Sequence, residues 1–448
     1  MNQIAFDRHR KHTYISSSFL FLVAFSTAYF PRLLDALGAP APINFIHFVT
    51  VPLVLAIVLR SGQLKSKQTG NFPYQLLIGL FILLTVITIS AFVNEAGYIN
   101  LIIEYLLLAE PFMLLLAIIL IPMSLKKLRQ FQGFLLICAS INLVLALIQK
   151  PLIDAGLLFA QGFDGTDGAQ GVFFVSGAGN YVSSTVSLKF GLYYLLASKK
   201  SPLWFRCIWL VGACVQVIIS DSKQIIIACA IAFVAVVMRS LLINNRKALM
   251  YVVVAIILGL GFIWAVNNVE YFSAYRNGFR KISEWGPGGS AREIKLAPFE
   301  IATSYYTSIL NWLFGLGPGH TFGRLGGWFL RDYADLLEPL GATVHQASED
   351  GMNAYWNSWI AQESTLNHPF YGWAGIWGDL GLVGLSAYLY LAALVWKNVC
   401  FDDLNKFFLI VISVVGTIFT QMEEPGYMLF VAFLIGLRYQ EKILQHKN

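Results

Sequence analysis

The chain has 448 residues, of which 57% are hydrophobic and only 12% are charged. Soluble domains carry roughly 25% charged residues, so this composition excludes a soluble globular protein and predicts an all-α polytopic membrane protein. The net charge of +6 therefore reports on membrane topology and is no sign of nucleic-acid binding. The five cysteines lie in apolar segments or in loops that we predict to be cytoplasmic, which excludes a disulfide framework and a metal-type spacing.

Apolar runs of about 17 to 25 residues mark the expected membrane spans, because a helix rises 1.5 Å per residue through a hydrocarbon core of about 30 Å. We expect the first run to be retained as an anchor helix, because prolines disfavour cleavage at the nearest small-residue motif, 39–41. The sequence predicts about twelve spans, at 14–30, 43–59, 73–93, 99–121, 131–149, 179–198, 203–220, 224–242, 248–266, 373–396, 405–422 and 425–438.

Basic residues support this number of spans. If the N-terminus is cytoplasmic, every predicted inner segment holds two or three Lys or Arg residues, 20 of the 31 in the chain, whereas the short outer loops hold almost none. This alternation predicts that both termini are cytoplasmic. It divides the chain into nine spans (1–266), a large, partly helical outer loop (267–369) and three further spans (370–448). We find no internal repeat, which argues against a transporter with two symmetric halves.

Three motifs distinguish the outer loop from a membrane span: GPGGSARE (286–293), GLGPGHTFGR (315–324) and ESTLNHPFYGW (363–373). In the first motif, Arg292 follows several glycines and begins a predicted helix. A helix N-terminus with free N–H groups beside an arginine is a suitable phosphate site. Ser290 and Glu293 have the spacing of a capping box, in which case Glu293 occupies those N–H groups instead. The glycines of the second motif follow a predicted helix and not a strand, so they indicate a turn and not a dinucleotide-binding loop.

Other cations on the predicted outer side are further candidates for binding an anion. Arginine is the preferred phosphate ligand, because its guanidinium binds two phosphate oxygens at once. Lys223 lies at the outer mouth of the eighth span, where it either binds an anion or extends to the membrane interface. Arg324 and Arg331 lie in the outer loop, where each is either a further anion ligand or a solvated side chain.

A proton acceptor is expected where the outer loop returns to the membrane. His368 lies just before the tenth span, and an imidazole accepts a proton near neutral pH, although the residue can equally be a packing histidine. His320 and His345 are alternatives within the loop, and Glu363 and Asp379 flank His368 in the sequence and are candidates to orient it. No group of His, Cys, Asp or Glu has metal-ligand spacing, so we predict a site without a metal or another cofactor.

Seven of the eleven tryptophans lie in the same quarter of the chain. An indole ring offers a flat apolar face and one hydrogen-bond donor, which suits a sugar ring. Tryptophan is also enriched at membrane interfaces, which is the alternative role. The candidates for glycan contact are Trp328, Trp356 and Trp359.

Five ionisable residues in or near the expected spans have open roles. Glu104, Glu110 and Lys189 fall within spans, where a charged group usually faces a partner or a water-filled cavity. Glu104 and Lys189 have the alternative of a shallower position near the interface. Glu423 and Glu424 fall in the last predicted outer loop. There they could bind an acceptor or a cation, and the alternative is that they belong to a solvated turn.

Three stretches together resemble the bacterial O-antigen polymerase and O-antigen ligase families, which are membrane enzymes that act on lipid-linked saccharides. In 218–232, Lys223 stands where the family has the arginine of a Ser-Arg-Gly-like motif, and the change loses the bidentate fork of arginine. In 288–319, Arg292 matches an arginine at a helix start that precedes a Gly-x-Gly turn. In 366–385, His368 matches a histidine that precedes a Gly-rich helix.

This resemblance implies a polymerase of O-antigen or exopolysaccharide repeat units in a bacterial inner membrane, with its active site on the periplasmic side. A sugar hydroxyl of a lipid-linked acceptor would attack a glycan carried on polyprenyl (undecaprenyl) pyrophosphate, in a metal-independent, inverting glycosyl transfer. Arg292, Lys223 and Arg324 would bind the pyrophosphate, and His368 would accept the proton. The implied partners are the lipid-linked donor and acceptor, the bilayer and, as an optional partner, a chain-length regulator. The alternatives are a ligase that transfers the glycan to lipid A-core and, in another class, a transporter or lipid-linked oligosaccharide flippase.

Overall fold

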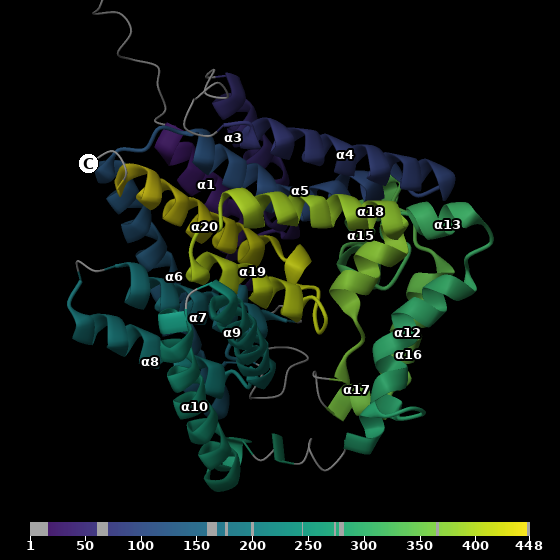
Figure 1. The fold of residues 1–448 in the computed structure, drawn as a ribbon. Coiled ribbons are helices and arrows are strands. Elements are labelled where there is room, and N and C mark those ends of the chain that lie inside the picture. Colours follow the sequence, from purple (N-terminus) through teal and green to yellow (C-terminus); the bar gives the residue numbers. More distant parts are fainter. Residues whose placement is uncertain are drawn as a thin grey trace, which may run out of the picture.

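The computed structural model describes residues 17–60, 70–158, 168–174, 178–198, 201–243, 245–272, 275–276, 282–363 and 367–445. Within these ranges every regular element is a helix, as the composition predicts for an all-α membrane protein. Apolar membrane-type helices flank a segment of shorter helices, and α1 lies in the same corner of the molecule as the C-terminal end of α20 (Figure 1).

The helices before the outer loop are α1 (Ser17–Tyr29), α2 (Pro31–Ala36), η1 (Ala41–Phe45), α3 (His47–Arg60), α4 (Phe72–Val93), α5 (Tyr98–Leu120), α6 (Leu125–Asp154), η3 (Gly171–Phe173), α7 (Gly179–Ala197), α8 (Leu203–Ile219), α9 (Lys223–Ile243) and α10 (Asn245–Asn268). The segment 270–363 contains η4 (Glu270–Phe272), η5 (Ile282–Trp285), α12 (Ser290–Ser304), α13 (Ile309–Phe314), η6 (Leu325–Phe329), α14 (Leu330–Asp332), α15 (Ala334–Leu337), η7 (Glu338–Leu340), α16 (Gln346–Asn357) and α17 (Trp359–Glu363). The chain ends with α18 (Tyr371–Asn398), α19 (Asp403–Val415), η9 (Gln421–Glu423) and α20 (Pro425–Gln445).

Seven helical segments in the described part of the chain are long and apolar enough to cross a membrane. They are Ala41–Arg60, Phe72–Val93, Tyr98–Leu120, Leu125–Asp154, Lys223–Ile243, Arg246–Asn268 and Tyr371–Asn398. The other five expected spans coincide with α1, α7, α8, α19 and α20, which are shorter or more polar. Each expected stretch therefore overlaps a helix, while the number of twelve spans stays a prediction.

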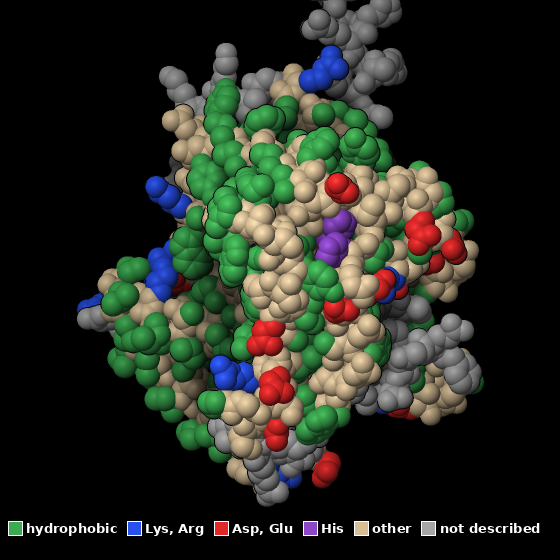
Figure 2. All heavy atoms as spheres, turned by 90° about the vertical axis from the view of Figure 1, so that its right-hand side faces the viewer, with side chains coloured by type: hydrophobic (Ala, Val, Ile, Leu, Met, Phe, Trp, Pro, Cys, Tyr) green, Lys and Arg blue, Asp and Glu red, His purple; other side chains and the backbone are tan. Residues whose placement is uncertain are grey.

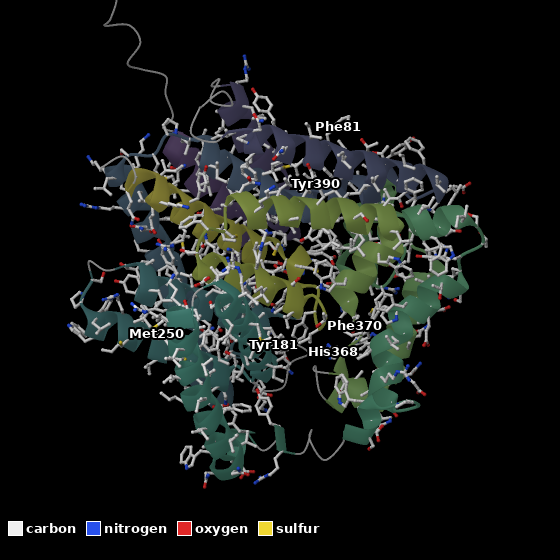
Figure 3. The ribbon with its side chains drawn as sticks, in the orientation of Figure 1. Phe81, Tyr181, Met250, His368, Phe370 and Tyr390 are labelled. Atoms are coloured by element: carbon white, nitrogen blue, oxygen red, sulfur yellow. The ribbon has the colours of Figure 1, made fainter. Side chains whose placement is uncertain are left out.

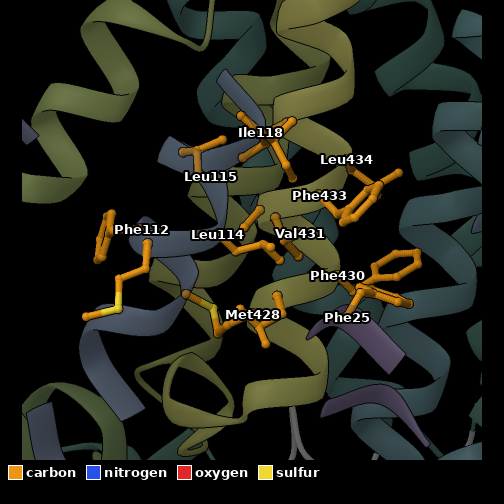
Figure 4. Close-up of a cluster of buried hydrophobic side chains, with 14 of the residues drawn as sticks. Phe25, Phe112, Leu114, Leu115, Ile118, Met428, Phe430, Val431, Phe433 and Leu434 are labelled. Atoms are coloured by element: carbon orange, nitrogen blue, oxygen red, sulfur yellow. The ribbon is translucent and has the colours of Figure 1, made fainter. Parts of the chain in front are cut away.

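Helices α5 and α20 form the centre of the bundle (Figure 4). α5 is apolar on nearly all sides, which predicts a helix surrounded by protein, and 83% of its apolar window is buried. Leu114 and Ile118 of α5 share a buried cluster with Phe430 and Phe433 of α20. Gly436 permits this close packing, because a Cβ there would lie 2.8 Å from Ile118. By contrast, only 6% of the corresponding window of α10 is buried, as expected for a helix that faces lipid.

Helix α18 bends where the long apolar helices meet the segment 282–363. Its later part runs beside α4, whereas its first turns lie toward α12 (Figure 1). The bend is at Gly381, whose φ of +67° lies in the left-handed region that favours glycine. A Cβ at Gly381 would lie 2.4 Å from the backbone of Leu313, so glycine also lets α13 pack into the bend.

The segment 282–363, which we predicted to be the outer loop, is docked onto the bundle by apolar contacts. Leu325, Phe329 and Leu337 are buried against Ile103 and Leu107 of α5. Figure 2 shows the face that this segment presents at the right of Figure 1, with acidic side chains scattered over it and few basic ones.

Candidate active site

The glycine-rich loop 315–321 wraps around the carboxylate of Asp379 in α18. The Gly319 N–H donates to Oδ2 (2.9 Å), and the N–H and hydroxyl of Thr321 donate to Oδ1 (2.7 Å each). Gly315, Gly317 and Gly319 have φ values of +71°, +110° and +72°, which glycine adopts without strain. The motif is thus a turn, as predicted, and two of its N–H groups bind a protein carboxylate. Asp379 fixes this turn, which differs from its expected role of orienting His368.

Arg324 ends the same motif and is paired with the last outer loop. Its guanidinium forms an ion pair with Glu424, and its backbone N–H donates to Glu423 Oε2 (3.1 Å). Both glutamates are buried, so the solvated turn considered from the sequence does not form. Because Glu424 already neutralises Arg324, this arginine is a weaker candidate for binding pyrophosphate than its sequence context indicates.

Glu104 of α5 completes an acidic cluster with Asp379, Glu423 and Glu424. Its side chain is 2% exposed, so it is enclosed by protein, while its depth in the membrane stays a prediction. It interacts electrostatically with Asp379 and Glu423. Its Oε2 is buried without a hydrogen-bond partner among the described residues, and so is Oε1 of Glu423.

His368 lies just before α18 in an aromatic environment. Its Nε2 shares a hydrogen bond with the Tyr355 hydroxyl (3.3 Å), and the rings of Tyr355, Tyr371 and Phe419 surround it at centroid distances of 5.0 to 6.0 Å. Burial, together with the positive charge of Lys295, lowers the pKa of His368 to about 3. The imidazole is therefore neutral and weakly basic. The side chain of Glu363, the other residue expected to orient it, lies outside the described part of the chain.

Lys295 is a site residue that sequence reasoning missed. It is 5% exposed, and its Nζ lies 3.4 Å from the Thr417 carbonyl and 5.3 Å from the Phe370 ring centroid. Burial lowers the pKa of Lys295 to about 7, and no acidic group among the described residues pairs with it. The available signal was its position three residues after Arg292, because residues with this spacing share one face of a helix.

Arg292 lies in the first turn of α12, on the same face as Lys295. Its side chain is exposed and forms no ion pair within the described residues. The expected capping box is absent, since the N-cap of α12 is Gly289 and the Ser290 N–H donates to Glu284 Oε2 (3.2 Å). Glu284 thus uses one of the helix N-terminal donors, while the guanidinium of Arg292 is left for a ligand.

Lys223 approaches the site from the opposite group of helices. It begins α9, and its Nζ pairs with Asp221 (2.5 Å). The hydroxyl of the neighbouring Ser222 donates to the carbonyl of Asn180 in α7. The next residue of α7 is Tyr181, whose ring stacks on Phe419 at a centroid distance of 4.4 Å. The Phe419 ring also contacts His368. Residues of α7 and of the segment just before α18 therefore meet at the Phe419 ring. Figure 3 shows Tyr181 and His368 facing the same central region.

The three tryptophans chosen as glycan contacts have different environments. Trp328 is half-buried, stacks on Phe322 (5.4 Å) and contacts Tyr371 (4.9 Å), so it belongs to the aromatic cluster beside His368. Trp356 and Trp359 are each 58% exposed on α16 and α17. Arg331 is also exposed, with a weak contact from its Nη2 to Ser348 Oγ (3.4 Å).

Two further ionisable groups are buried in the bundle, away from this site. Lys189 is 1% exposed, and its Nζ donates to the Tyr427 hydroxyl (2.5 Å) and the Phe408 carbonyl (3.3 Å). Glu110 Oε2 pairs with His47 Nδ1 (2.8 Å). Lys189 and Glu110 are therefore buried with partners within the protein, while the depth of Lys189 in the membrane stays a prediction.

No protein-family model and no curated protein matches this chain. The resemblance to O-antigen polymerases and ligases therefore rests on the motifs alone. The geometry nevertheless places Lys295 near His368, and Arg292 lies one helical turn before Lys295 in α12. Such a set can bind a dianionic group where a membrane helix begins.

Proposed function

We propose that the chain is a membrane glycosyltransferase that polymerises O-antigen or exopolysaccharide repeat units carried on polyprenyl pyrophosphate. The observation that carries this proposal is the buried ammonium of Lys295, which has no acidic partner among the described residues and lies one helical turn after the exposed Arg292. A buried unpaired cation is unfavourable, and a diphosphate would supply the missing negative charge.

The chemistry follows from this charge arrangement. The acceptor hydroxyl attacks the anomeric carbon, the bond from that carbon to the pyrophosphate oxygen breaks, and the diphosphate leaves with the electron pair. Arg292 and Lys295 stabilise the negative charge that develops on the leaving group, in place of a metal ion. Lys223, already paired with Asp221, is a secondary ligand.

The proposed location is a bacterial inner membrane, with both termini cytoplasmic and the site periplasmic. The alternation of basic residues along the chain supports this orientation. A ligase that uses the same donor and a lipid A-core acceptor is the alternative within this class. Supplying each acceptor in turn to the purified protein separates the two.

The direct experiment reconstitutes the protein in nanodiscs with a lipid-linked repeat unit and measures glycan length. Wild type should elongate the glycan, and Arg292→Ala and Lys295→Met should each lose about 10- to 100-fold in rate, as expected for a lost charge-assisted hydrogen bond. The control is Lys397→Ala, an exposed lysine at the far end of α18. Wild-type elongation by both site variants would reject this site.

A transporter or flippase is the second candidate, favoured by the buried ionisable groups within the helices. Glu104, Lys189 and the His47–Glu110 pair lie deep in the bundle. Vesicles that contain the protein and a fluorescent lipid-linked glycan test it. Translocation without elongation, together with its loss in Glu110→Gln, would favour transport over glycosyl transfer.

A further inference from the structure

Two glutamates beneath the outer segment have side-chain oxygens that bond to nothing in the described structure. Glu104 Oε2 and Glu423 Oε1 are both buried without a hydrogen-bond partner, and each side chain is 2% exposed. Buried polar atoms nearly always have partners, and an exception indicates an exchangeable proton, a water or a ligand. Two such atoms on interacting residues of different helices mark a site.

The other charges of the cluster are already satisfied. Asp379 accepts three hydrogen bonds from Gly319 and Thr321, and Glu424 is neutralised by Arg324. The charged groups that act on Glu423 are Arg324, which favours its ionised form, and Asp379 and Glu104, which disfavour it. Among the described residues the cluster therefore holds four carboxyls, those of Glu104, Asp379, Glu423 and Glu424, and the single guanidinium of Arg324. Buried carboxyls in such excess cannot all ionise, so at least one of them retains a proton.

A close crossing of two backbones holds Glu423 in place. A Cβ at Gly375 of α18 would lie 2.7 Å from the Cα of Gly323, so glycine is required for this approach. The two oxygens of Glu423 lie 3.9 Å from the Cβ positions of these glycines, and the Arg324 N–H fixes Oε2. Oε1 is thus the oxygen left to exchange a proton.

The chain segment that carries Glu423 also contacts the proposed donor site. η9, which carries Glu423, begins two residues after Phe419, and the Phe419 ring contacts His368 at 6.0 Å. His368 itself is a poor proton acceptor because burial and Lys295 disfavour its charged form. The reaction therefore needs another base in this region, and a carboxyl kept in a desolvated site can serve as one.

We propose that Glu104 and Glu423 share one proton and that Glu423 is the catalytic base of the glycosyl transfer. This inference rests on the proposed function. As the acceptor oxygen bonds to the anomeric carbon, its proton passes to Glu423 Oε1, and the pyrophosphate leaves with the electron pair of the broken bond. The proton is later released to water, which restores the shared state.

The protonation of Glu423 agrees with this role. Burial raises the pKa of Glu423 to about 8, and Arg324 offsets only part of the effect. Because a base must be ionised to act, the elongation rate should rise with pH up to about 8. Replacing Glu104 by Gln removes the competing negative charge, so the midpoint of this rise should move to lower pH.

Infrared spectroscopy tests the shared proton without relying on any activity. Wild type at pH 7 should show the carbonyl band of a protonated carboxyl group. Glu423→Gln and Glu104→Gln should each remove the same part of that band, because in either variant the remaining carboxylate ionises. Glu338→Gln, an exposed glutamate of η7, is the control and should leave the band unchanged. A band that stays intact in both cluster variants would overturn the shared proton.

The elongation assay then tests the base. Glu423→Gln should lower elongation at least 100-fold at every pH while donor binding is retained, and Glu104→Gln should shift the pH profile as described. Wild-type elongation with an unchanged pH profile in Glu423→Gln would overturn the assignment. A wild-type protein that does not elongate any lipid-linked glycan would instead refute the proposed function, with the infrared result still deciding whether the proton is shared.

Discussion

The charged face of α12 and the acidic cluster around η9 handle buried charge in opposite ways. On α12, Lys295 is buried and Arg292 is exposed, and neither has an acidic partner in the described residues. Around η9, Arg324 is neutralised within the protein, and the excess carboxyls are left to hold a proton. Under our proposals, an anion from outside completes the α12 face, whereas the protein and a proton complete the cluster. Both regions begin with an arginine near several glycines, so arginine and glycine alone do not identify an anion site.

The largest effect is expected when the charges of α12 are removed together. Arg292→Ala combined with Lys295→Met should reduce elongation about a thousandfold, because two charge-assisted contacts to the leaving group are lost. The thermal midpoint should change little or rise, since burying the Lys295 ammonium is itself unfavourable. Parallel assays of elongation and thermal unfolding check this. A large fall in the midpoint would mean that the charges stabilise the fold and not the reaction.

For Arg324 we expect a large effect on the stability of the fold, in contrast to the α12 charges. Arg324→Ala leaves the buried Glu424 carboxylate unpaired and should destabilise the protein by about 3 kcal/mol. The double variant with Glu424→Gln should recover most of that loss. Thermal unfolding in detergent of the two variants beside wild type measures the effect. Equal midpoints for the single and double variants would show that the ion pair is not the cause.

The pH dependence of donor binding separates the two regions further. Since burial places the pKa of Lys295 near 7, below its usual value of 10.5, the free protein above pH 7 carries this lysine mostly neutral. Binding an anion must then take up a proton, and affinity should fall as pH rises from 7 to 9. For the same reason the folded state binds fewer protons than the unfolded state between pH 7 and 10.5. The cost of burying Lys295 should therefore shrink, and the free energy of unfolding should rise, as pH increases across that window.

Titration calorimetry in two buffers of different ionisation enthalpy measures this proton uptake. Lys295→Arg should abolish the uptake, because arginine stays charged throughout this range. Proton uptake of equal size in wild type and Lys295→Arg would assign it to another group.

The smallest effect is expected at His368. His368→Gln replaces one neutral polar group beside Tyr355 by another, so elongation should fall by less than about tenfold, the weaker end of the range for a neutral hydrogen bond. A loss as large as that for Glu423→Gln would restore His368 as the base. Single-turnover assays of both variants at the same pH allow the comparison.

Local patterns in the sequence predicted the helical stretches and the glycine turn, because hydrophobic runs and backbone freedom are properties of nearby residues. The pairing of Arg324 with Glu424 joins positions far apart in the chain, and no periodicity reveals it. Lys295 was missed because a lysine within a helix looks like a solvated residue until its burial is known. The role of Asp379 likewise depends on a loop that lies well before it in the sequence.

The bend of α18 at Gly381 has an evolutionary consequence. Gly381 lies thirteen positions after His368. Within a helix, each added or removed residue rotates the residues that follow it by about 100° about the helix axis. A single insertion there would turn Asp379 away from its loop and break the Gly323–Gly375 crossing at the same time. Relatives of this protein should accordingly keep the length of this stretch constant while the exposed surfaces of α16 and α17 drift freely.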